Sequence, residues 1–241
     1  AIRAPAGATL GEMFPGRFWL AVGSGEALNE HITGAKWPPK PKRNERLKEC
    51  ADVMRALWAG ETVTHDGHVT VKEAKLWSRP KAPPRLVGAA VSPETARWLG
   101  GWADGLVTTG RPKEEMREII GAFRAGGGEG KPVLVQHGIS YARDEATAMR
   151  QAHEQWRFCA LDADTLWDLR TPEEFAKATA KVTPEQVAEK LRISSDLGRH
   201  AEWINDYAEL DVAEVYVFNA GKNQREFIEA FGAKVLPQLK G

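Results

Sequence analysis

The stretch RLVGAAVSPETARWLGGWADGLVTT, residues 85–109, decides the fold. Leu86–Ala90 is a short apolar run that predicts a buried strand. Ser92 followed by Pro93 is typical of a helix start, because Ser caps free amides and Pro fits the first turn. A second apolar run, Gly105–Thr108, predicts another strand. Strand, helix and strand with short connections indicate a parallel pair joined by a right-handed crossover.

The same alternation continues on both sides of this unit. Further strands are expected over Arg17–Val22, Pro132–Ser140 and Val212–Phe218. The long helices are expected over Asn44–Trp58, Pro112–Ala125, Asp144–Phe158 and Asn223–Leu236. Five main strands by themselves favour an open, doubly wound α/β sheet, since a closed barrel of alternating strands and helices needs eight.

Two segments interrupt the alternation. Residues 62–72 are rich in β-branched side chains around Asp66-Gly67, a pair typical of a tight hairpin turn. Residues 161–209 show only helical signals, and we expect an inserted group of helices there. A chain of 241 residues is within the size of one α/β domain. We therefore expect a single domain over 1–241 that carries both insertions.

Composition excludes several classes of function. The 33 Lys and Arg residues balance 33 Asp and Glu residues, so no overall field favours a nucleic acid or an anionic membrane. The apolar runs fall far short of the roughly 20 residues that cross a bilayer. Cys50 and Cys159 are the two cysteines, which indicates a reducing compartment and no disulfide framework. We expect a soluble, cytoplasmic protein that acts on a small molecule.

The loop after the first strand is the first candidate site. It reads Gly23-Ser24-Gly25-Glu26. Ligands of parallel α/β folds bind at the carboxyl ends of strands, and glycines there let the backbone approach a flat or anionic ligand. Burial beside an apolar ring would raise the pKa of Glu26 toward the working range, so that it could act as proton donor or base. The alternative is an ordinary turn with a solvated Glu26.

Two further loops join a strand to a helix, and we call them the phosphate loops. They read Ala89-Ala90-Val91-Ser92 and Thr108-Thr109-Gly110-Arg111. Both precede helix N-termini, where free amides and the helix dipole favour an anion, and Arg111 would add a fork-shaped donor. Together they predict a phosphate site. The alternative is an ordinary N-cap at Ser92 and a solvated Arg111.

Other polar residues are not assigned to a site. His65 and His68 flank a two-residue turn and lack the spacing of zinc ligands, so no metal site is predicted. His137 lies in a strand, where a core histidine bonded to a neighbour is expected. The motifs of nucleotide hydrolases and serine hydrolases do not occur.

A longer pattern carries a family resemblance. Glu12–His31, read with Pro93–Ala96, Gly101–Gly105 and the final strand and helix, resembles the luciferase-like flavin oxidoreductases. The chain is most similar to the branch of deazaflavin-dependent glucose-6-phosphate dehydrogenase and its FMN-using relatives. The resemblance spans essentially the whole chain. It implies a (β/α)8 TIM barrel that holds FMN or coenzyme F420 at its carboxyl-terminal face, with the cofactor phosphate at the phosphate loops.

The resemblance also implies roles for residues of the first loop. Glu26 matches an acid near the reacting carbon, and Asn29 would fix the ring or the substrate. The expected activity is that of an FMN- or F420-dependent oxidoreductase or monooxygenase on a small organic substrate, with FMN as the first choice of cofactor. A non-catalytic flavin-binding or structural paralogue is the alternative from another class.

One departure from the family pattern concerns the start of the chain. Family members carry three more strand–helix units before this point, and the chain begins within what would be the third helix. Pro5 and Gly7 oppose a helix there. Five strands cannot close an eight-stranded barrel, so open edges would remain. We therefore expect an incomplete barrel, either a fragment or a natural short paralogue that pairs its open side in a homodimer.

Overall fold

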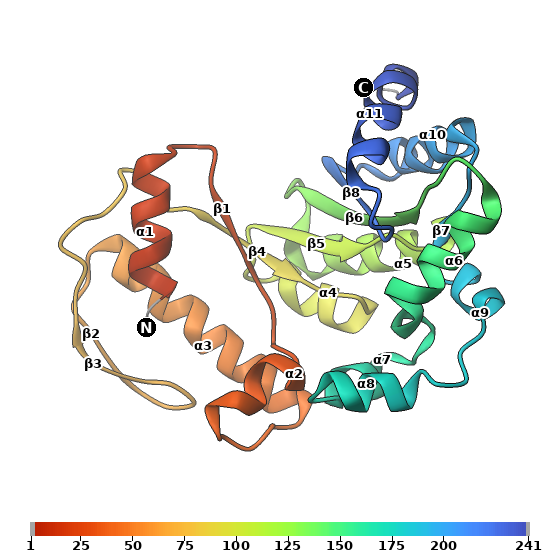
Figure 1. The fold of residues 1–241 in the computed structure, drawn as a ribbon. Helices are drawn as coiled ribbons and strands as arrows, with labels where there is room; N and C mark the ends of the chain where they lie inside the picture. Colours follow the sequence, from red (N-terminus) through yellow and green to blue (C-terminus); the bar gives the residue numbers. More distant parts are fainter. Residues whose placement is uncertain (1–2, 240–241) are drawn as a thin grey trace.

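The computed structural model describes residues 3–239 and contains a parallel sheet with helices packed against it (Figure 1). The five main strands run in the order β1-β4-β5-β6-β8. Their bounds are β1 Trp19–Val22, β4 Arg85–Ala89, β5 Gly105–Thr109, β6 Val133–Ser140 and β8 Glu214–Asn219. Each of the five predicted strands is therefore confirmed, with ends that differ by a few residues.

The helices follow the predicted alternation. Before and between the first strands lie α1 Arg3–Met13, α2 Ala27–Glu30, α3 Lys40–Ala59 and α4 Pro93–Gly100. The later helices are α5 Lys113–Phe123, α6 Glu145–Trp156, α7 Ala163–Asp168, α8 Pro172–Ala178, α9 Pro184–Ala188, α10 Leu197–Asn205 and α11 Gln224–Lys234. Their predicted starts are confirmed where side chains accept a backbone N–H, at Ser92, Asp144, Thr171 and Thr183.

Helix α1 shows that the expectation of a broken helix at Pro5 and Gly7 was wrong. Pro5 lies in the first turn, where the N–H that it lacks would have no helical partner. Gly7 faces Trp58, and a Cβ there would lie 2.9 Å from Cζ2 of the indole. The indole Nε1 of Trp58 also donates to the carbonyl of Ala4 at 2.8 Å. Close packing against α3 thus compensates for the low helix propensity of glycine.

The two predicted interruptions have different outcomes. The hairpin is confirmed as antiparallel strands β2 Val63–Asp66 and β3 Thr70–Ala74. The purely helical reading of residues 161–209 was wrong, because the two-residue strand β7, Arg192–Ile193, pairs with the carboxyl end of β6. So short a strand has no visible periodicity, and its pairing with a distant strand defines it.

The two faces of the sheet have different surroundings. Leu106, Val133 and Val135 are fully buried and pack with the apolar faces of α4 and α5. On the opposite face, the rings of Trp19 in β1 and Tyr216 in β8 lie with centroids 6.2 Å apart. Among residues 3–239, β1 and β8 each pair with one strand, so contact between these edge strands shows that the sheet curls. It is an open α/β sheet with the curvature of a barrel.

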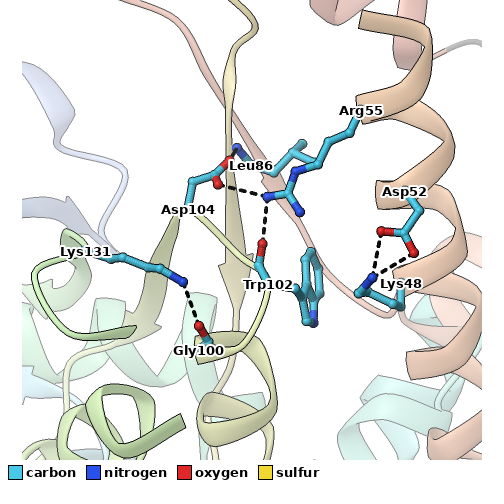
Figure 2. A network of polar contacts seen from close by, with 8 residues as sticks. All are labelled: Lys48, Asp52, Arg55, Leu86, Gly100, Trp102, Asp104 and Lys131. Atoms are coloured by element: carbon cyan, nitrogen blue, oxygen red, sulfur yellow. Dashed lines mark hydrogen bonds and ion pairs between the residues drawn. The ribbon is translucent and has the colours of Figure 1, made fainter. Parts of the chain in front are cut away.

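A polar network ties α3 to the turn before β5 (Figure 2). The carboxylate of Asp104 accepts from Leu86 N at 2.8 Å and from Arg55 Nη2 at 2.9 Å. The same Nη2 donates to the carbonyl of Trp102 at 2.7 Å. One carboxylate therefore fixes the amino ends of two neighbouring strands and the helix that covers them.

Replacing Asp104 tests this network. Asp104→Ala should lower the free energy of unfolding by roughly 1–3 kcal/mol, because Leu86 N and Arg55 lose their shared acceptor. The control is Asp52→Ala, which removes an exposed pair with Lys48 on the same helix as Arg55 (Figure 2) and should change that free energy by about 0.5 kcal/mol or less. Urea unfolding measures both. Equal losses in the two variants would contradict a special role for Asp104.

Candidate active site

The first loop leaves β1 and turns into the short helix α2. Gly25 has a φ of +87°, a left-handed conformation that favours glycine, and a Cβ there would lie 3.1 Å from Oε1 of Glu30. Glu26 is the N-cap residue of α2, but its side chain makes no capping bond. It accepts instead from Asn29 Nδ2 at 3.4 Å. The two predicted catalytic residues are therefore brought together, with the amide directed at the carboxylate.

The second loop lies beside the first. A Cβ built at Gly23 would lie 3.6 Å from the Cβ of Ala89, which is ordinary contact between the ends of the paired strands β1 and β4. The third loop follows β5, whose Val107 pairs with Ala89. The residues predicted for cofactor binding thus come from three loops at one edge of the sheet. Their roles in binding stay a prediction.

The phosphate loops contain both used and unused hydrogen-bonding groups. The Ser92 hydroxyl donates to Thr95 Oγ1 and accepts from Thr95 N, so it caps α4 as the simpler interpretation expected. Thr108 Oγ1 and Arg111 Nε are buried and have no hydrogen-bond partner within residues 3–239. Leaving such a donor unpaired costs roughly 1–3 kcal/mol. A phosphate at the N-termini of α4 and α5 would suit this donor set.

Arg111 also belongs to a group of charged residues that the sequence did not predict. It lines a small cavity together with Lys113, Arg192 and Asp206, and Arg111 and Lys113 are paired with Glu115 and Glu209. Arg192 lies in β7, far along the chain, and only the pairing of β7 with β6 brings it here. A search limited to strand–helix loops could not find it, because a two-residue strand gives no periodic signal.

His137 is a buried core residue, as predicted. It is 2% exposed, and its Nδ1 lies 2.8 Å from the hydroxyl oxygen of Tyr207. Burial lowers the pKa of His137 to about 4 and raises the pKa of Tyr207 to about 12, so both are neutral near pH 7. A Cβ at Gly110 would lie 2.4 Å from this hydroxyl. His137 and Tyr207 therefore pack against the third loop at Gly110, where the absence of a side chain leaves room for the Tyr207 hydroxyl.

The hairpin histidines contact glutamates of α3. His65 Nε2 lies 3.0 Å from Glu49 Oε2, and His68 Nε2 lies 2.9 Å from Glu45 Oε2. The hydrogen bond with His65 is the main cause of the lowered pKa of Glu49. No group of three or more His, Cys, Asp or Glu residues within the described chain could hold a metal ion.

A cavity of about 490 Å³ within residues 3–239 lies next to the first loop. Gly23 and Ser24 form part of its wall, whereas Glu26, Asn29 and the phosphate loops do not line it. The other walls come from α1, α3 and the hairpin, with Val22 of β1 and Glu30 of α2. The sequence did not predict this cavity because those elements meet only in the folded chain.

The helices after residue 161 reach the first loop. Figure 1 shows α7 and α8 close to α2, and α7 contacts α2. Trp37 Nε1 donates to Asp168 Oδ1 at 2.9 Å, and the guanidinium of Arg43 lies 4.2 Å from the Trp37 ring centroid. Trp37 therefore does not line the cavity but joins α7 to α3.

No helix within residues 3–239 has the length and apolar character needed to cross a membrane.

The fold and the convergence of these loops agree with the comparison with known families. The model of the luciferase-like monooxygenase family matches residues 1–214, and the chain belongs to this family. The predicted resemblance, the barrel-type fold class and the predicted class of enzyme, a flavin- or deazaflavin-dependent oxidoreductase, are confirmed.

The chain is also similar to individual proteins of known name or structure. The chain is 34% identical to an F420-dependent glucose-6-phosphate dehydrogenase of Microbacterium testaceum, over 97% of this chain and 72% of that protein. It is similar to the structure of an F420-dependent secondary alcohol dehydrogenase in complex with an F420–acetone adduct, with a TM-score of 0.89, 25% identity, and coverage of 100% of this chain and 75% of that one. A type II Baeyer–Villiger monooxygenase of Pseudomonas putida in complex with FMN has the same fold, with a TM-score of 0.68, 16% identity, and coverage of 100% and 76%.

The left-handed glycine of the first loop gives a test of the site. Gly25→Ala should weaken binding of a flavin-type cofactor, because the new methyl group crowds Glu30 and shifts the loop that carries Glu26. Gly34→Ala is the control, since Gly34 has a φ of +74° but open space around it. Both should lose about 1–2 kcal/mol of stability. Equal cofactor affinity in the two variants, measured by fluorescence titration, would contradict the placement of the site.

Proposed function

We propose that the chain uses coenzyme F420 to dehydrogenate a small substrate at a carbon that bears a hydroxyl group. The observation that carries this proposal is the TM-score of 0.89, over the whole chain, with a structure that holds an F420–acetone adduct. The relatives at about a third identity are also named F420-dependent dehydrogenases. These findings favour F420 over FMN, which was the first choice from the sequence.

The residues present fit such a cofactor. The close approach of Gly23 to Ala89 leaves a surface without large side chains where β1 and β4 end, which suits a flat ring. The unpartnered donors of Thr108 and Arg111 suit a phosphate beside the N-termini of α4 and α5. When bound, F420 would supply the hydride-transfer chemistry.

Glu26 would transfer the proton, and Asn29 would orient the carboxylate of Glu26. Glu26 Oε2 accepts from Asn29 Nδ2, which holds the carboxylate in one orientation. In the proposed reaction Glu26 takes the proton of the substrate hydroxyl, and it returns a proton in the reverse direction. Because the side chain of Glu26 is not used as a helix cap, it is available for this role.

The remaining expectations become part of the proposal. Residues 1–241 would form one domain, in which the hairpin at 62–72 and the helices of 161–209 are insertions, and the latter would cover the substrate and exclude water through the contact of Trp37 with Asp168. The half-exposed rings of Trp19 and Tyr216 on the open face of the sheet favour a homodimer. Two free cysteines favour the cytoplasm.

An FMN-dependent monooxygenase is the second candidate function. The fold of the FMN-bound monooxygenase, with a TM-score of 0.68, supports it. The two candidates differ in cofactor and in whether oxygen is consumed, so both can be tested on the same purified chain.

Cofactor preference is the first prediction of this proposal. The chain should bind F420 more tightly than FMN, because relatives about a third identical to it are named F420-dependent. Titration with each cofactor, followed by the change in its fluorescence, measures the two dissociation constants. Tighter binding of FMN would favour the monooxygenase, and binding of neither would favour a structural paralogue.

The proton-transfer role of Glu26 gives the second prediction. Glu26→Gln should lower kcat by roughly 10²–10⁴-fold, because the amide cannot accept the proton, while the dissociation constant for F420 stays unchanged. Glu118→Gln, at an exposed position of α5, is the matched control and should keep full activity. Steady-state reduction of F420 with secondary alcohols and sugar phosphates measures both. An active Glu26→Gln enzyme would exclude Glu26 as the acid–base group.

A further inference from the structure

The cavity beside the first loop has Gly23 and Ser24 in its wall, but not the proposed catalytic residues or the phosphate loops. At about 490 Å³ it is within the range of small-molecule sites, about 300–1,000 Å³. One stripe of α3 forms much of its wall, with residues at helical spacing on a single face: Arg43, Arg46, Leu47, Cys50, Val53 and Met54. The stripe is cationic toward the start of α3 and apolar toward its end.

The polar end of the cavity has an excess of positive charge. Arg3, Arg43 and Arg46 line it, and Glu30 is the single acid among the lining residues. Glu30 pairs with Arg46 at 3.4 Å, which is long for a charged hydrogen bond. Two guanidinium groups therefore have no acid partner within the cavity wall, and an anion placed there would be attracted.

Arg43 is the most buried of these three arginines. It is 6% exposed, and burial lowers the pKa of its guanidinium. Its Nη1 donates to the carbonyl of Pro38 at 3.0 Å, but its Nε has no partner within the described residues. Asp168 and Asp164 attract it from α7 without a hydrogen bond to it. The Trp37 ring also lies 4.2 Å from this guanidinium, so the unmet donor is Nε, and an anionic ligand would give that buried donor an acceptor.

The rest of the cavity is apolar. Leu47, Val53 and Met54 of α3 face Val71 of the hairpin, and Val22 closes the side next to the sheet. A ligand that fits both ends must have an apolar body and one anionic group. Inorganic anions lack the body, and apolar amines carry the wrong charge.

We propose that this cavity binds an apolar organic acid, with its carboxylate at Arg43 and Arg46 and its hydrocarbon body against Leu47 and Met54. The cavity does not include Glu26, Asn29 or the phosphate loops. It shares only Gly23 and Ser24 with the first loop. A bound ligand would therefore contact the two residues that lie shortly before Glu26 in the chain. The proposal does not depend on which cofactor the chain uses.

Octanoate is the probe for the test, and Cys50 is the reporter. Cys50 lines the cavity, whereas Cys159 does not, and both thiols are partly buried. Alkylation by iodoacetamide is followed by mass spectrometry of the two cysteine peptides from the native chain without cofactor. Octanoate should slow alkylation of Cys50 and leave Cys159 unchanged. Octylamine and acetate, which lack the charge or the body, should protect neither thiol.

Variants test the charged end. Arg46→Gln should weaken octanoate binding by about tenfold or more, because a charge-assisted contact is lost, as measured by calorimetry. Glu30→Gln should strengthen it, since the competing acid is removed. Lys48→Gln is the control, because it makes the same charge change on the same helix but outside the cavity. All three positions are partly exposed, so folding should be retained.

Two results would overturn the proposal. Equal protection of Cys50 by octanoate and octylamine would mean an apolar pocket without preference for an anion. Equal affinity for octanoate in Arg46→Gln and Lys48→Gln, or the absence of any protection, would mean that the cavity is not an organic-acid site. The cofactor titrations are independent of both outcomes, so failure here leaves the proposed dehydrogenase activity untouched.

Discussion

Parallel pairing of β4 with β1 and β5 is the constraint on which the rest of the structure depends. It places Ala21 beside Val87 and Val87 beside Gly105, so three strands end at the same edge of the sheet. The loops that follow those strands must then meet there, whatever their sequences. The candidate site is a consequence of this pairing, and the Asp104 carboxylate holds the opposite ends of β4 and β5 in place.

The candidate site combines small residues in its loops with buried hydrogen-bond donors that have no partner among the described residues. Glycine at 110 lets the third loop pack where a Cβ would collide with the Tyr207 hydroxyl, and Gly23 lies beside the small side chain of Ala89. The same region leaves Thr108 Oγ1 and Arg111 Nε buried without partners among the described residues. These unpaired donors support the proposal that an anionic group of a ligand binds at this edge of the sheet.

Segments far apart in the chain also contact the loops at this edge of the sheet. The hydrogen bond of Trp37 with Asp168 brings α7 to the first loop, and the pairing of β7 brings Arg192 to Arg111. The cationic and apolar cavity behind Gly23 likewise combines α1, α3 and the hairpin. These contacts extend the site beyond the strand ends. They place α7 beside α2, the helix that follows Glu26.

The sequence by itself determined the five strands, their helices and the loops between them, because apolar periodicity, N-caps such as Ser92 and turn residues such as Asp66-Gly67 act locally. It also singled out Glu26 and Asn29 as candidate catalytic residues, and the structure joins them by a hydrogen bond at the start of α2. Only the tertiary structure decided that α1 continues through Gly7, that Arg192 forms a strand, and that Arg43 and Cys50 line a cavity. Each of these depends on packing between distant segments, which leaves no local signal in the chain.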